Sequence, residues 1–75
     1  MMPLTMARPG ERMTLVALRG GQRVRKRLAD LGLTASTSLH IVQGSGHGPL
    51  IVAVRGTRLA IGRGMAHHIL VKPAR

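Results

Sequence analysis

The stretch LIVAVRGTRLAIG, residues 50–62, decides the fold. Its first five residues are all apolar, which is typical of a central strand that is covered on both faces. Arg55 and Gly56 then predict a tight turn, and residues 57–62 return as the antiparallel partner strand. A lone hairpin cannot cover both faces of residues 50–54, whereas a small closed or nearly closed barrel can.

Further strands are predicted on both sides of this hairpin. From Glu11 onward, Met13, Leu15 and Ala17 alternate with more polar residues, and the sequence RGG at residues 19–21 ends this first strand. The segments SLHIVQ (residues 38–43) and HILVK (residues 68–72) predict two more strands, with a short turn over residues 63–66 before the last. The chain is therefore expected to be mostly β, with about five short strands in one small barrel.

One short helix is expected after the first strand, over residues 21–31. Val24, Leu28 and Leu31 recur at i, i+4 and i+7, which places them on one apolar stripe that faces the barrel. Leu28 and Leu31 are expected to plug one end of it. Gly32 stands where a left-handed C-terminal cap of this helix would lie.

The length of 75 residues indicates one small domain. Pro3, Pro9 and Gly10 mark residues 1–10 as a flexible N-terminal arm, so a single barrel domain is expected over residues 11–75. The longest apolar run is far short of the ~20 residues that span a bilayer, and the N-terminus has no apolar core of signal-peptide length. We therefore expect a soluble, cytoplasmic protein without direct membrane insertion.

The charge balance is strongly basic, with 12 Lys and Arg against 2 Asp and Glu and a formal net charge of +10. Such a chain attracts nucleic acid, acidic lipid or an acidic protein. Four cations, Arg23, Arg25, Lys26 and Arg27, crowd into the first half of the expected helix, where the helix dipole repels them. This group is either a solvated basic face or a surface that faces an anionic partner.

Two residue classes are missing, and each absence excludes a class of function. The chain has no cysteine, which rules out disulfides, thiolate zinc sites and thiol nucleophiles. It has no aromatic residue, so the usual base-stacking surfaces and aromatic-lined peptide grooves cannot form. Glu11 and Asp30 are its only carboxylates and belong to different elements, which argues against catalysis by paired carboxylates.

The four histidines are the remaining candidate metal ligands. His40 and His47 are isolated, while His67 and His68 are neighbours that would point to opposite faces of an extended strand. Only a turn at His67 would let both converge, and a closed site needs three or four ligands. We expect no tightly held metal ion, with His67 and His68 as weak candidates for a loosely bound divalent ion such as Fe or Zn.

The order of the segments resembles a known family. RLADLGL (residues 27–33) followed by SLHIV (residues 38–42) resembles the FeoA family, the small cytosolic component of bacterial ferrous iron transport. GPLIVAVRGTRLAIGRGMAHHILV (residues 48–71) is similar to the family's C-terminal half, and Ala66, Ile69 and Val71 fill its closing A-x-x-I-x-V motif. Ala35 and Ser36 stand where the family usually has a Pro-Gly pair.

The resemblance implies an SH3-like barrel without enzymatic activity. It also implies a partner, the membrane-bound ferrous iron transporter FeoB with its cytosolic GTPase domain, whose iron uptake the protein would modulate. The four helix cations would then form the edge of a docking surface. A small basic nucleic-acid-binding barrel is the alternative, which the charge supports and the missing aromatics disfavour. Weak self-association is left open.

Overall fold

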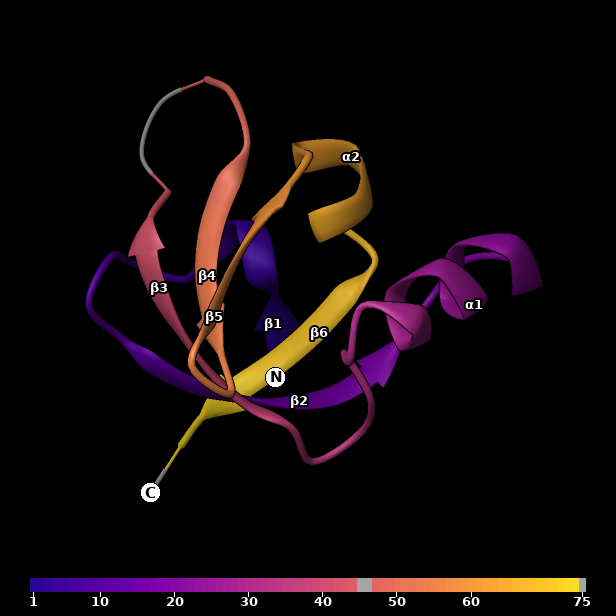
Figure 1. Ribbon diagram of the computed structural model, residues 1–75, viewed down its shortest axis with the longest axis horizontal. Coiled ribbons are helices and arrows are strands. Elements are labelled where there is room, and N and C mark those ends of the chain that lie inside the picture. The colour runs from indigo at the N-terminus through magenta and orange to yellow at the C-terminus, as the bar shows by residue number, and fades with distance from the viewer. Residues whose placement is uncertain (45–46, 75) are drawn as a thin grey trace.

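The computed structural model describes residues 1–44 and 47–74. Six antiparallel strands form one sheet in the order β1-β6-β2-β3-β4-β5, which curls around a single core (Figure 1). Along the chain the elements are β1 (Met2–Pro3), η1 (Leu4–Met6), β2 (Arg12–Leu18), α1 (Gln22–Asp30), β3 (Ser38–Gln43), β4 (Leu50–Val54), β5 (Thr57–Ile61), α2 (Arg63–Ala66) and β6 (Ile69–Pro73).

This architecture confirms the predicted mostly β, SH3-like fold, in which the main helix, α1, follows the long strand β2. Among the described residues, the edge strands β1 and β5 do not pair with each other, so the barrel is not closed. The sequence predicts five of the six strands. The sixth, β1, has two residues, too few to show an alternating pattern.

The β4–β5 hairpin forms as its sequence predicts. Val54 pairs with Thr57, so the turn consists of Arg55 and Gly56 alone. Both turn residues have positive φ, 51° for Arg55 and 78° for Gly56, as in a type I′ turn, whose twist matches that of the flanking strands. β4 lies between β3 and β5, and Leu50, Val52 and Val54 alternate into the core while Ile51 and Ala53 are half-buried.

The core is made entirely of aliphatic side chains and methionine. Each inner strand contributes alternate residues to it, as the two-residue period of a strand requires. Residues from the helical segments and the loops cover its ends. The buried apolar residues are Leu4, Ala7, Met13, Leu15, Leu28, Leu33, Leu39, Ile41, Leu50, Val52, Val54, Ile61, Ala66, Ile69 and Val71.

The first ten residues are part of this fold, which corrects the expectation of a flexible arm. Met2 and Pro3 pair with Val71 and Leu70 of β6, and Leu4 is fully buried. The Glu11 carboxylate accepts a hydrogen bond of 2.6 Å from the Arg8 backbone N–H, which holds the turn that leads into β2. Pro9 and Gly10 do lie in irregular backbone, but Pro3 belongs to strand β1, and the buried Leu4 packs this segment against the core.

The C-terminal end of α1 departs from the predicted apolar stripe. Leu28 is fully buried and Val24 packs at the edge of the core, whereas Leu31 is 43% exposed. Gly32, at φ 89°, reverses the chain, so that Leu33 N–H donates to Leu28 C=O at 3.0 Å. This is a Schellman motif with the predicted glycine cap, and it brings Leu33 rather than Leu31 onto Leu28.

A pair of leucine variants tests this arrangement. Leu28→Ala should lower the free energy of unfolding by about 2–5 kcal/mol, because truncation of a buried leucine leaves a cavity. Leu31→Ala should change it by less than about 0.5 kcal/mol, because Leu31 is largely exposed. Urea denaturation measures both, and equal losses would contradict the placement of Leu31 outside the core.

Ser36 offers a test of the unusual turn before β3. It has φ 71°, in the region where a Cβ atom is strained, and it stands at the glycine position of the expected Pro-Gly pair. Ser36→Gly should raise the free energy of unfolding by about 0.5–1 kcal/mol, and Ser36→Val should lower it, because a β-branched residue tolerates this region least. The reverse order in thermal denaturation would show that this backbone is not strained.

Candidate partner-binding surface

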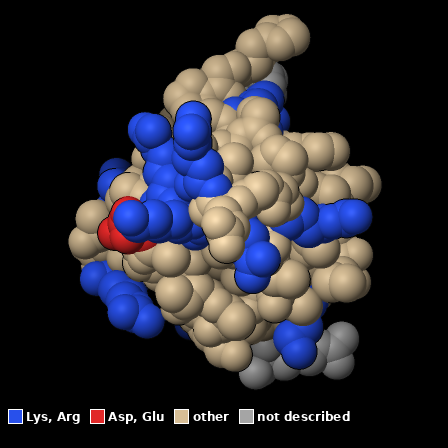
Figure 2. Space-filling model, turned by 90° about the vertical axis from the view of Figure 1, so that its right-hand side faces the viewer, with Lys and Arg blue, Asp and Glu red and all other residues tan. Residues whose placement is uncertain are grey.

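The four cations predicted from the sequence lie together on α1. Arg23, Arg25, Lys26 and Arg27 are all exposed, while Val24 and Leu28 hold the helix against the core. Viewed from the side of α1, the molecule shows a dense group of Lys and Arg side chains (Figure 2). We call these four residues the α1 basic face. The placement predicted from the apolar stripe is thus confirmed for its outward side.

Most end-turn charges of α1 run against its dipole: Arg23 and Arg25 lie in the first turn and Asp30 at the C-terminal end, and only Arg27 in the last turn is favourably placed. Its N-cap is Gly21, which has no side chain to accept from the first-turn N–H groups, and that turn contains no acidic residue. Asp30 lies at the C-terminal end, where carbonyl groups are already partially negative. Each adverse charge costs about 0.3–1 kcal/mol at low salt, so the helix depends on its buried leucine and its glycine cap.

The position of α1 leaves the basic face accessible. The helix projects to one side of the sheet, beyond the end of β2 (Figure 1). An exposed cluster on a projecting element can approach a flat or concave partner without steric hindrance from the rest of the domain. The arrangement suits electrostatic recognition of an acidic surface, in which guanidinium groups bind carboxylates in a bidentate manner.

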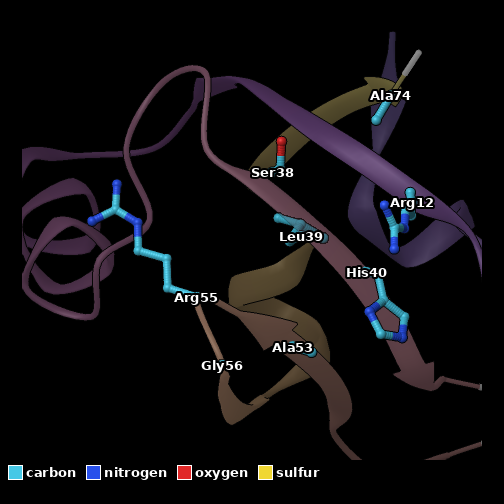
Figure 3. A pocket seen from close by; sticks show the side chains of 8 residues that line it. All are labelled: Arg12, Ser38, Leu39, His40, Ala53, Arg55, Gly56 and Ala74. Atoms are coloured by element: carbon cyan, nitrogen blue, oxygen red, sulfur yellow. The ribbon is translucent and has the colours of Figure 1, made fainter.

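A second basic region, not predicted from the sequence, is a groove of about 550 Å³ on the outer side of the sheet. Arg12 of β2 is directly opposite His40 of β3, and His40 is in turn opposite Ala53 of β4. Arg55 lies across the groove from Arg12 and His40, with the Ser38 hydroxyl between them (Figure 3).

The remaining lining residues of this groove are small or apolar, namely Leu39, Gly56 and Ala74. The alternation of Ser38 and His40 with apolar residues in β3 indicates that these two side chains face outward. The sequence does not show that Arg12 and Arg55 lie next to them, because this depends on the strand register.

Of the four histidines, only the neighbours His67 and His68 lie close together. His67 is exposed at the C-cap of α2, in helical conformation, so the backbone does turn there. His67 and His68 line a small hollow with Arg19, and the His68 ring packs over Gly20, where a Cβ atom would lie 3.3 Å from His68 Nδ1. His40 lies in the groove and His47 is exposed. Within residues 1–44 and 47–74, no three His, Asp or Glu side chains are placed to hold one metal ion.

Comparison with known proteins gives consistent matches over nearly the whole chain. The family model described as the FeoA domain matches residues 2–73. A curated protein of Methanocaldococcus jannaschii, the putative Fe(2+) transport protein A, is 32% identical over 74 residues, covering 99% of this chain and 89% of that protein.

Solved structures agree with these sequence matches. The crystal structure of an iron uptake regulatory protein (FeoA) superposes with a TM-score of 0.91 at 33% identity, covering 97% of both chains. A manganese-dependent transcriptional repressor in complex with manganese superposes with a TM-score of 0.90 at 19% identity, over 97% of this chain and 36% of the repressor, which is a likeness of fold alone. None of the described helices is long and apolar enough to cross a membrane.

The histidine geometry leads to a metal-binding prediction. Anaerobic titration of the isolated protein with Fe(II), or aerobic titration with Zn(II), should give only weak changes in the His67 and His68 NMR signals. Two adjacent imidazoles beside Arg19 provide too few ligands and an adverse positive charge. A stoichiometric, sub-micromolar site that His67→Ala or His68→Ala abolishes would contradict this prediction.

Proposed function

The chain belongs to the FeoA family of ferrous iron transport proteins, and from this premise we propose that it is a non-enzymatic accessory protein of that system. In this proposal it docks on the cytosolic side of the FeoB transporter, at the GTPase region, and modulates Fe(II) uptake. Family membership supports the transport role, and the α1 basic face supports docking on a protein.

The observation that carries the proposal is the α1 basic face. Four exposed cations repel one another, and Arg23 and Arg25 in the first turn also oppose the helix dipole, so an acidic partner would offset an unfavourable charge arrangement. Complementary charge acts mainly on the rate of association, so the face would steer the protein onto its partner. Docking would alter transport only if the protein binds one conformation of the transporter more tightly than another.

The side chains support a role without catalysis. The two carboxylates belong to different elements and do not form a pair. The Glu11 carboxylate accepts a hydrogen bond from the Arg8 backbone N–H, and Asp30 is exposed at the end of α1. Cysteine is absent from the sequence. These residues offer neither a paired-carboxylate site nor a thiol nucleophile.

Charge reversal on α1 tests the docking proposal. Arg23→Glu/Lys26→Glu should weaken binding to the purified cytosolic GTPase domain of the transporter several-fold at physiological salt, because complementary charges become like charges. The same change should leave stability equal or higher, because glutamate near a helix N-terminus is favourable. Lost binding in this variant therefore cannot be attributed to unfolding, which urea denaturation checks.

A matched control separates the α1 basic face from the overall charge. Arg8→Glu/Lys72→Glu changes the net charge by the same amount at two exposed positions outside α1, and should bind nearly as well as the unmodified protein. Equal weakening by both double variants, or normal docking by the α1 variant, would refute the proposal.

The nucleic-acid alternative is tested in the same experiment. Random duplex DNA should bind the unmodified protein no more tightly than the ~10⁻⁴–10⁻⁶ M of nonspecific charge attraction. Nanomolar DNA binding would favour the alternative function instead.

A further inference from the structure

We propose that the groove between β2, β3 and the β4–β5 turn is a second binding site, which takes an extended acidic segment of a protein. This site is separate from α1 and does not depend on the docking role proposed for the α1 basic face. Its ionisable residues come from β2, from β3 and from the β4–β5 turn, whereas the α1 basic face is one helix.

The strand register builds the cationic side of the groove. Arg12 and His40 are opposite each other on neighbouring antiparallel strands, and side chains in such pairs lie within contact distance on the same face. His40 is also opposite Ala53, whose small side chain leaves room beside the imidazole. Arg12 and His40 therefore lie side by side on the outer face of the sheet, and the short Ala53 side chain leaves the space beside His40 open (Figure 3).

Arg55 supplies the second cation from a position that is conformationally unusual. It is the first residue of the two-residue turn and has φ 51°, a conformation that asparagine or glycine adopts at lower cost. It lines the groove on the side opposite Arg12 and His40, and its guanidinium extends outward from that side, away from them (Figure 3). Local structure alone does not favour arginine at this position of the turn. We therefore attribute Arg55 to binding of a ligand in the groove.

The groove lining has the chemistry to bind carboxylates. Its ionisable residues are Arg12, Arg55 and His40, and no acidic residue lines it within the described parts of the chain. Of the side-chain hydrogen bonds between residues in these parts, none involves the two arginines, His40 or the Ser38 hydroxyl. Two guanidinium groups and a hydroxyl are thus available to donate hydrogen bonds to an anionic ligand.

The shape of the groove favours a peptide over a small molecule or a nucleotide. Small ligands are usually enclosed by concave, mostly apolar pockets, whereas this groove is partly open to solvent and has ionisable residues on both sides. The chain has no aromatic side chain on which a nucleobase could stack. The small residues Ala53, Gly56 and Ala74 let a peptide backbone approach closely while its carboxylates reach the arginines at either side.

The proposal is tested with a defined probe, a fluorescein-labelled peptide of alternating glutamate and alanine. Its binding to the full chain is measured by fluorescence anisotropy at physiological salt. Arg12→Gln/Arg55→Asn should weaken binding about tenfold, since it removes both guanidinium groups. Asn-Gly is the preferred type I′ turn, so the Arg55→Asn change should preserve or stabilise the hairpin, which thermal denaturation checks.

A matched control and a matched probe complete the test. Arg8→Gln/Lys72→Gln removes the same charge at two exposed positions outside both the groove and α1, and should leave peptide affinity within about twofold. A peptide with glutamine in place of glutamate should not bind, and amide NMR shifts induced by the acidic peptide should centre on Ser38, His40 and Gly56.

Three outcomes would overturn the proposal: equal weakening by both double variants, equal binding of the neutral peptide, or displacement of the acidic peptide by a lower concentration of duplex DNA. Because the groove and α1 variants are separate, the failure of one proposed site leaves the other to be judged by its own measurement.

Discussion

The curled sheet must bury one face of every inner strand, and this chain has to do so without a single aromatic side chain. Leucine, isoleucine, valine and methionine at alternate positions make the interior of such a small barrel, because they interdigitate at close-packed density. A curled sheet covers the core only from the sides, so the ends of the core need separate covers. Leu28 with Leu33, Leu4 and Ala66 provide them from the helical segments and loops.

These covers explain why the N-terminal segment and α1 belong to the domain. A chain of this size has little apolar surface to bury, so each fully buried leucine is a large share of its stability. α1 keeps its place through Leu28 and the Schellman motif at Gly32, although its first-turn arginines and Asp30 oppose its dipole. The helix can therefore carry a basic outer face because its inner face is anchored.

The cationic residues that support the two proposals are all outside this core. The α1 basic face and the groove lie on different elements; α1 groups its cations on one helix, whereas the groove has one arginine on each side. The α1 basic face could be predicted, because its residues are close in sequence and alternate with an apolar stripe of helical period. The groove could not, because Arg12, His40 and Arg55 meet only through the pairing of β2 with β3 and β3 with β4.

The sequence by itself determined the local structure of this protein: the strands of β2 to β6, the two-residue turn at Arg55 and Gly56, and the helix that Gly32 ends. Each of these depends on backbone conformation and on a period of 2 or 3.6 residues, which neighbouring residues specify. The tertiary structure decided that Leu4 and Leu33 enter the core, that Leu31 stays outside it, and that three strands form a basic groove. Those outcomes depend on chain reversals and strand register, which bring together residues that are distant in sequence and that no local pattern relates.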